Sequence, residues 1–475
     1  MATIEVVADP VLNDRPPPRE PERRCLGILE AARTYSSTYL APSAATMSSS
    51  RGDVNEVFPH KVCINLDRDL DSWERLQAAL TRHDVRGVRR VSAVDGSRLE
   101  LPATWRHSAG AYGCLRSHLQ VVRDARKRGL PSLLILEDDV LFDPSFSEKF
   151  PVFVRGLPAD WDMVFLGALH REDPDPVAEN VVRIRQAYCT HAYALRDSIF
   201  DAFIAANDGS PNAVDVNNGV LQSSHNCYGF APNLAWVESH YSPVQERMAD
   251  LWYLRESVVP LGSQMDRILQ RTVVIIAHRA SNGSVNKGQN VGFLSRFYAE
   301  FLPGIKTCVV EQGGRGTLGS SDLPAGCSYL LVQDEGPFDR TRCFAAGLEH
   351  APPDCAFVIL SDDNLFIDAL SIRANLRICE RYDCATGFKS CVKLTEADTE
   401  SVRRNKFAKG IDLTTYGVTE EGPPFVHYGL FRRDMFRAQG TRLDILLKGL
   451  ISDTKNDVSH RVFRSPNMVL RLYPG

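Results

Sequence analysis

One acidic frame occurs twice in this chain, each time at the end of an apolar run. The first copy reads LLILEDDVLF at residues 133–142, and the second reads FVILSDDNLF at residues 357–366. Upstream of each copy lies a segment that predicts an opening strand, at residues 61–68 and 272–279, followed by a helix-like segment. Self-similarity over this distance indicates a duplicated architecture, so we expect two domains of one α/β fold.

The acids in this frame need a partner. Consecutive carboxylates between apolar runs repel one another unless a cation, an arginine or a helix N-terminus offsets their charge. Carboxylates suit Mg²⁺ or Mn²⁺, which nucleotide enzymes hold with one or two acids plus substrate phosphates. We therefore interpret the acidic motif as a metal site, with acids that cap a following helix as the alternative.

Composition narrows the class of protein. The net charge of −4 over 475 residues and a pI near 6.3 offer no basic surface for nucleic acid. The 12 cysteines are scattered without C-x-x-C pairs or His/Cys clusters, so neither a zinc site nor a disulfide framework is predicted. The N-terminus lacks the pattern of a signal peptide, and no apolar run approaches the roughly 20 residues of a membrane span. We expect a cytoplasmic protein.

The order of segments predicts the domain boundaries. Residues 1–56 are rich in Pro, Arg and Ser and predict a disordered leader, with one short helix near residues 26–33. The first domain is expected at 57–250, a linker at 251–270 and the second domain at 271–475. The glycine-rich segment 311–316 lacks a P-loop lysine and predicts a flexible loop.

Strand, helix and strand open the first domain. Asp69 is a candidate N-cap of a helix, and a strand at 88–94 ends in Asp95-Gly96. The apolar residues of the helix fall on one face: Leu70, Trp73, Leu76 and Leu80. Ligands of such sheets bind beyond the carboxyl ends of the strands, where residues 65–68, 95–96 and 137–139 would meet.

A glycine-containing segment, residues 110–118, leads into a helix with Leu115, Leu119 and Val122 inward. Glycines before a helix permit a phosphate to approach backbone N–H groups. A plain turn is the alternative for the glycines, and a structural helix residue is the alternative for His118.

The order of these pieces resembles glycosyltransferase family 25, which includes bacterial lipopolysaccharide galactosyltransferases and collagen hydroxylysine galactosyltransferases. The resemblance covers about residues 58–245. It rests on these motifs: INLDR at 64–68, Trp73, AVDG at 93–96, GAYGCLRSH at 110–118, LILEDDV at 134–140, DWDMVFLG at 160–167 and THAY at 190–193.

This resemblance implies a GT-A fold, in which a nucleotide-binding sheet holds Mn²⁺ or Mg²⁺ on the diphosphate of a nucleotide sugar. Glu137 and Asp139 take the metal-binding spacing, with Asp138 between them as a further catalytic candidate. An inverting displacement needs a carboxylate that takes the acceptor's proton, and Asp215 is the candidate, with an exposed loop acid as the alternative. The candidates for the nucleotide pocket are Asn65, Leu66, Arg68, Trp73, Asp95, Gly96, Gly113, Ser117 and His118.

Residues 272–473 are similar to β-1,4-galactosyltransferase and family 2-like transferases. This likeness assigns Asp362, Asp363 and Asn364 to a metal and Asp457 to catalysis, and we add His278, Arg279 and Arg340 as nucleotide-binding candidates. Asp339 replaces the usual Asn, and Asn364 replaces a second carboxylate. Metal affinity falls with ligand charge, so both an active and a non-catalytic second domain stay open.

Together these features predict two tandem GT-A domains that form a metal-dependent, bifunctional glycosyltransferase. It would move galactose or glucose from a UDP-sugar to a saccharide or a hydroxylated protein side chain, with Mn²⁺ or Mg²⁺ as cofactor. The alternatives are a single active domain beside a non-catalytic one, a nucleotidyltransferase, and a binding protein without activity.

Overall fold

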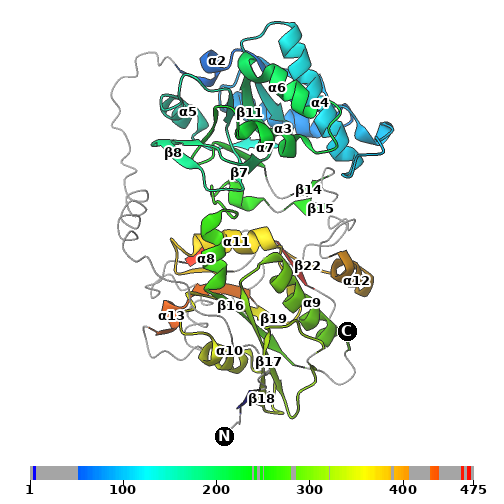
Figure 1. Cartoon of the computed structure of the whole chain (residues 1–475), viewed down its shortest axis with the longest axis vertical. Coiled ribbons are helices and arrows are strands. Elements are labelled where there is room, and N and C mark those ends of the chain that lie inside the picture. Colours follow the sequence, from blue (N-terminus) through cyan, green and yellow to red (C-terminus); the bar gives the residue numbers. More distant parts are fainter. Residues whose placement is uncertain are drawn as a thin grey trace.

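Two α/β units lie one above the other along the long axis of the molecule (Figure 1). The structure, a computed structural model, describes residues 4–6, 52–237, 240–242, 247–249, 251–279, 285–319, 321–386, 390–405, 428–437, 462–464 and 468–471. Each unit is built around an eight-stranded sheet. The predicted α/β class is therefore confirmed.

The first sheet has the strand order β3-β2-β4-β11-β6-β12-β9-β8. Its strands are β2 (Lys61–Asn65), β3 (Val88–Ser92), β4 (Ser132–Glu137), β6 (Met163–Phe165), β8 (Asp175–Ala178), β9 (Val181–Arg183), β11 (Ala192–Arg196) and β12 (Cys227–Phe230). Strand β2 is parallel to both β3 and β4, whereas β11 is antiparallel to β4. The carboxyl ends of β2, β3 and β4 thus share one edge, as predicted.

The helices of this unit are α2 (Val54–Val57), α3 (Leu70–Arg82), α4 (Ala109–Lys127), α5 (Phe146–Val154), α6 (Asp197–Asn207) and α7 (Val214–Gln222). Asp69 caps α3 as predicted, since its side chain accepts a hydrogen bond from the Ser72 backbone N–H. Leu76 and Leu80 are buried, but Leu70 is 54% exposed. Its predicted inward orientation is wrong because the first turn of α3 presents this residue to solvent.

The inward face predicted for α4 is confirmed, because Leu115, Leu119 and Val122 are all buried. The helix starts earlier than predicted. Ser108 is its N-cap and accepts a hydrogen bond from the Ala111 backbone N–H, so Gly113 lies inside the helix rather than before it.

Gly96 and Gly113 let the chain after β3 pack directly on α4. A Cβ atom on Gly96 would lie 1.8 Å from the Ala109 carbonyl oxygen, and one on Gly113 would lie 2.4 Å from the Val94 carbonyl oxygen. The turn η1 (Gly96–Arg98) can therefore approach α4 only because neither position carries a side chain. This packing fixes the place of Asp95 at the edge of the sheet.

The second sheet has the order β1-β18-β17-β16-β19-β23-β21-β24. Its strands are β1 (Ile4–Val6), β16 (Thr272–His278), β17 (Lys306–Gly313), β18 (Ser328–Gln333), β19 (Phe357–Asp362), β21 (Cys384–Thr386), β23 (Tyr428–Arg432) and β24 (Val462–Arg464). Strand β16 pairs in parallel with β17 and β19, and β17 pairs in parallel with β18. The helices are α9 (Val285–Phe301), α10 (Arg340–His350), α11 (Ala369–Ile378), α12 (Glu396–Asn405) and α13 (Asp434–Arg437).

Short paired strands complete both units. They are β5 (Val140–Phe142) with β13 (Ala235–Val237), β7 (Leu169–His170) with β10 (Ala187–Tyr188), β14 (His240–Ser242) with β15 (Arg247–Ala249), and β25 (Met468–Arg471) with β20 (Leu365–Phe366) and β22 (Ser390–Lys393). Among the helices that the structure describes, none is both long enough and apolar enough to cross a membrane.

Two segments differ from the sequence predictions. Inside the predicted leader, β1 pairs antiparallel with β18, and α2 begins at Val54; the helix predicted at 26–33 lies outside the described residues. The glycine-rich segment is not a loop throughout, because residues 311–313 belong to β17. Glu311 is buried there, and its carboxylate accepts hydrogen bonds from the Thr317 hydroxyl and the Tyr329 hydroxyl, both at 2.7 Å.

The segment predicted as a linker is folded between the two units. It contains η2 (Trp252–Leu254) and α8 (Ser263–Gln270). Trp236 of the first unit packs in one apolar cluster with Trp252 and with Val274 of the second sheet. The Trp252 indole N–H donates to the Ser371 hydroxyl at 3.3 Å. This shared core joins the units through apolar contacts.

His170 makes the fold sensitive to acid. Its side chain is buried, and burial lowers its pKa from 6.5 to about 4. Between these values the unfolded chain binds the proton and the folded chain does not, so stability falls as pH drops from 6.5 to 4, by about 3 kcal/mol in all. Denaturant unfolding of His170→Gln should lose this part of the pH dependence, whereas His350→Gln, at an exposed position, should keep it. Equal slopes in both variants would contradict the assignment.

The close approach of η1 to α4 predicts the effect of a single methyl group. Gly96→Ala should lower the free energy of unfolding by about 3 kcal/mol, because backbone atoms rather than a flexible side chain stand in the way. Gly219→Ala is the control, since a Cβ atom in that helix would lie 3.6 Å from the nearest atom. It should be neutral or stabilising by up to about 1 kcal/mol. Similar effects of both changes on the unfolding midpoint would disprove this explanation.

Candidate active site

Asn65 ties the end of β2 to the acidic turn after β4. Its amide nitrogen donates to the Asp138 carboxylate and to the Asp69 carbonyl at 2.8 Å, and its amide oxygen accepts from Arg90 Nε at 2.7 Å. Burial raises the pKa of Asp138 above its usual value, although the Asn65 amide opposes this shift. Asp138 is thus held against β2 by a neutral donor.

Glu137 is the last residue of β4 and meets polar groups from two other elements. The Thr190 hydroxyl donates to Glu137 Oε1 at 2.6 Å, and His118 Nε2 of α4 lies 3.3 Å from the same oxygen. His118 is buried, and its Nδ1 lies 2.9 Å from the Tyr193 hydroxyl. Burial works to raise the pKa of Glu137, but His118 and Thr190 outweigh it and hold the pKa below its usual value.

Three carboxylates share this corner of the first unit. Asp215 lies in the first turn of α7, where it is half-buried. Burial raises its pKa, and the negative charge of Glu137 raises it further. The pKa of the Cys114 thiol is raised well above its usual value by burial and by the charges of Glu137, Asp215 and Asp139. The predicted base and the predicted metal ligands therefore lie within electrostatic reach of one another.

An ion pair closes the edge of the sheet beside β3. The Arg68 guanidinium bonds the Asp95 carboxylate, which also accepts from the Ser97 hydroxyl at 2.7 Å. Hydrogen bonds from Ser97, and then the bond and charge of Arg68, lower the pKa of Asp95. The Leu66 carbonyl accepts from Arg90 Nη2 at 3.3 Å. Arg68 is 58% exposed, so it can reach an anionic ligand at this edge.

Other predicted pocket residues contribute packing contacts. Ser117 is buried, donates to the Gly113 carbonyl at 2.7 Å and accepts from the Val94 backbone N–H at 2.8 Å. Trp73 packs against the apolar core on the face of α3. Together with Gly96 and Gly113, these residues hold α3, α4 and η1 in place around the corner.

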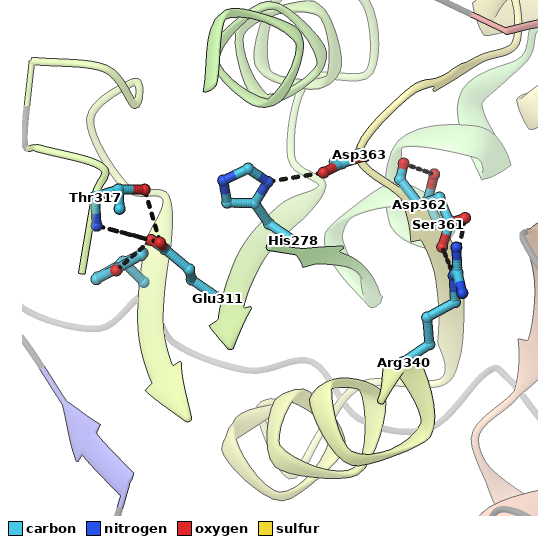
Figure 2. A network of polar contacts seen from close by, with 8 residues as sticks. His278, Glu311, Thr317, Arg340, Ser361, Asp362 and Asp363 are labelled. Atoms are coloured by element: carbon cyan, nitrogen blue, oxygen red, sulfur yellow. Dashed lines mark hydrogen bonds and ion pairs between the residues drawn. The ribbon is translucent and has the colours of Figure 1, made fainter. Parts of the chain in front are cut away.

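The second unit has a different arrangement at the matching place (Figure 2). The Arg340 Nε atom of α10 donates to both oxygens of the buried Asp362 carboxylate, at 2.8 and 3.0 Å. Asp363 Oδ2 lies 2.8 Å from Nδ1 of His278, the last residue of β16. Asn364 follows in the turn before β20. Both acids of the second frame thus face a basic side chain of the protein itself.

The remaining candidates of the second unit fall in two groups. Arg279 Nη2 donates to the Glu335 carbonyl at 3.2 Å, and Arg279 Nη1 donates to the Gly336 carbonyl, so this side chain fastens the loop after β18. Asp457, the predicted catalytic acid, lies outside the described residues.

Sequence analysis missed one group of residues around Glu137. The motif at 190–193 does not predict that Thr190 contacts Glu137 or that Tyr193 contacts His118. Cys114 and His118 are four residues apart, a spacing that places both on one face of a helix. This spacing differs from the C-x-x-C pairs that are typical of zinc sites.

Comparison with known proteins gives a match for the segment that contains the acidic turn after β4. Residues 60–188 match the family described as Glycosyltransferase family 25 (LPS biosynthesis protein). The chain is 28% identical over 157 residues to procollagen galactosyltransferase 2 of Mus musculus, covering 28% of this chain and 25% of the relative. It is 30% identical over 166 residues to inactive glycosyltransferase 25 family member 3 of Homo sapiens, covering 29% and 27%. The chain thus spans about a quarter of the length of these relatives.

Solved structures give only a slight likeness. Glucosyl-3-phosphoglycerate synthase from Mycobacterium tuberculosis, in complex with Mn²⁺, UDP and phosphoglyceric acid, has a TM-score of 0.28 at 12% identity, covering 45% of this chain and 75% of that one. A 4-diphosphocytidyl-2C-methyl-D-erythritol synthase from Anaerococcus prevotii has a TM-score of 0.25 at 14% identity, covering 45% and 91%. The sequence matches are the specific finding: residues 60–188, less than half of the chain, match glycosyltransferase family 25.

Proposed function

We propose that this chain is a metal-dependent glycosyltransferase that moves galactose or glucose from a UDP-sugar to a hydroxyl group. The acceptor would be a saccharide or a hydroxylated protein side chain. The observation that carries the proposal is the acidic turn with Glu137 and Asp139, which follows the carboxyl edge of parallel strands β2 and β4 within the segment that matches family 25. Asp215 of α7 lies outside that segment but within electrostatic reach of these acids. A ligand that bridges these acids and Arg68 would lie across the ends of β2, β3 and β4.

The residues of this corner fit a hard divalent cation. Carboxylate oxygens are the ligands that Mg²⁺ and Mn²⁺ prefer, and Glu137 and Asp139 would supply them. The raised pKa of Asp215 in the presence of Glu137 indicates that the acids repel one another. A bound cation would relieve this repulsion and neutralise a leaving diphosphate.

The protein's own side chains would do the remaining work. Asp215, whose pKa is raised by burial and by Glu137, suits a base that takes the proton of the acceptor hydroxyl. Arg68 would meet the phosphates of the donor at the exposed edge. Asn65 donates a hydrogen bond to Asp138, so Asp138 would act in positioning rather than in proton transfer.

We infer that catalysis belongs to the first unit alone. Arg340 bonds both oxygens of Asp362, and His278 bonds Asp363, so the second frame already has its countercharge. A cation there would have to displace a guanidinium from a buried carboxylate, which leaves that charge unpaired. This favours the single-site form of the prediction over the bifunctional form.

A binding protein without activity is the second candidate. One human relative is named an inactive family 25 member, and the chain is 30% identical to it over 166 residues. An enzyme would need the acids of the first unit for turnover of a UDP-sugar, whereas a binding protein would show no turnover.

Measurement of UDP-sugar turnover distinguishes the enzyme from the binding protein. With Mn²⁺, the purified chain should hydrolyse UDP-galactose or UDP-glucose slowly without an acceptor. Asp139→Asn should lower this rate at least about 100-fold, because a metal ligand is lost, and Asp362→Asn should leave it within about twofold. The rate of UDP release measures both, with circular dichroism as the check on folding. No turnover across a panel of UDP-sugars and metals would favour the binding protein, and loss in Asp362→Asn alone would move the active site to the second unit.

The role of Arg340 as a structural countercharge predicts its effect on stability. Arg340→Ala should lower the free energy of unfolding by about 2–4 kcal/mol, because it leaves the buried Asp362 carboxylate unpaired. Arg342→Ala is the matched control: this arginine is one turn away at most and pairs with the more exposed Asp334, so it should cost less than about 1 kcal/mol. If added Mn²⁺ fully restores the stability of Arg340→Ala but not that of Arg342→Ala, Asp362 is instead a metal ligand.

A further inference from the structure

Three potential metal ligands meet beneath the carboxylate corner of the first unit. They are Cys114 and His118 of α4 and Glu137 at the end of β4. Their ligand atoms, a sulfur, a ring nitrogen and a carboxylate oxygen, all lie within 4.8 Å of one another. Among the residues that the structure describes, this is the one group of three or more such side chains found at this spacing.

The two ligands on α4 are placed by the helix itself. Residues four apart lie one turn apart on the same face, so the Cys114 and His118 side chains point the same way. The close packing of Gly113 on η1 and the buried Leu115 and Leu119 fix the rotation of the helix. The pair therefore faces the end of β4 without any rearrangement of the backbone.

The separation of His118 and Glu137 fits two ligands of one ion. Their facing atoms lie 3.3 Å apart, which is longer than the 2.9–3.0 Å typical of an N–H···O hydrogen bond. His118 Nε2 is buried and makes no hydrogen bond within the usual geometric limits. Nitrogen and oxygen ligands of a tetrahedral zinc ion would lie about 3.4 Å apart, given metal–ligand bonds of about 2.0–2.2 Å.

Groups behind the ligands orient them. The Tyr193 hydroxyl lies 2.9 Å from His118 Nδ1, and the Thr190 hydroxyl donates to Glu137 Oε1 at 2.6 Å. When Nδ1 carries the ring proton and donates it to Tyr193, the lone pair of Nε2 faces Cys114 and Glu137. Hydrogen bonds of this kind to the far nitrogen of a ligating histidine are usual in metal sites.

We propose that Cys114, His118 and Glu137 form a binding site for a borderline-soft divalent cation of the Zn²⁺ type, with a fourth position left for water or a ligand. Thiolate and imidazole ligands select zinc-like ions over Mg²⁺ or Mn²⁺, which prefer oxygen. The thiolate and the carboxylate together balance the charge of the ion, and the thiol proton of Cys114 leaves to solvent on binding. This site is separate in chemistry from the hard-cation site proposed above, although both use Glu137.

Cobalt as a spectroscopic substitute for zinc tests the site without any assay of turnover. The full chain, freed of metal with a chelator, is titrated with Co²⁺ under reducing conditions. It should take up one equivalent with a thiolate-to-cobalt charge-transfer band in the near ultraviolet, and one equivalent of Zn²⁺ should abolish the band. Cys114→Ser should lose the band and bind Zn²⁺ at least about 10-fold more weakly. Cys189→Ser is the matched control and should keep both properties.

The control is chosen for its surroundings. Cys189 is half-buried like Cys114, and its pKa is raised by burial and then by the same three acids, Asp215, Glu137 and Asp139. It is not a member of the group of three ligands. Thermal unfolding of the metal-free variants checks that both fold like the parent chain.

Each other outcome overturns the site. Absence of a thiolate band in the parent chain excludes Cys114 as a ligand. A band that survives Cys114→Ser, or that disappears in Cys189→Ser, places the bound ion elsewhere. The thiolate band is measured independently of sugar transfer. A band without UDP-sugar turnover would retain the zinc-type site and reject the proposed function. Turnover without a band would reject the zinc-type site and retain the proposed function.

Discussion

The acids that follow β4 are compatible with a buried strand end because other elements supply their partners. Thr190 and His118 meet Glu137, and Asn65 meets Asp138. A carboxylate that loses water must gain hydrogen bonds or opposite charge, otherwise it is protonated or the fold opens. The partners of these carboxylates thus come from three elements. Asn65 lies at the end of β2, Thr190 precedes β11, and His118 belongs to α4.

The two units show how the same frame can reach different electrostatic solutions. In the second unit a guanidinium binds Asp362 directly, whereas in the first the partners of Glu137 are a hydroxyl and an imidazole. An arginine carries a permanent charge that satisfies its acid fully, so little remains to attract an ion. In the first unit burial, and then the charge of Glu137, raise the pKa of Asp215, so this corner has a negative potential that a cation would offset. The repeated frame therefore has different partners in the two units.

Much of the framework could be predicted from sequence because it depends on local patterns. The strand at 272–279, the helix that Asp69 caps and the inward face at Leu115 and Leu119 follow from apolar periodicity and capping, and the structure has them at nearly the same residues. The parallel order of β2, β3 and β4 placed three polar strand ends at one edge. The prediction for Leu70 is wrong because periodicity gives the spacing of apolar residues but does not show which of them the rest of the chain covers.

The partners of the acids could not be predicted, because they come from distant parts of the chain. Nothing in the sequence near residue 362 shows that Arg340 will bind it, and the frame at 133–142 does not show that His118 will face Glu137. Gly113 illustrates the same limit: in the segment 110–118 it suggests a phosphate-binding turn before a helix, whereas in the structure it lies inside α4 and allows close backbone packing.

In the proposed function a cation and a sugar diphosphate meet at Glu137 and Asp139 and not at Asp362. A crystal structure of the full chain with Mn²⁺ and UDP, with the manganese located by its anomalous scattering, tests this most directly. The account predicts an anomalous peak between the Glu137 and Asp139 carboxylates with the diphosphate beside it, and Arg340 still on Asp362. A peak at Asp362, or UDP bound with no metal near Glu137, would contradict it.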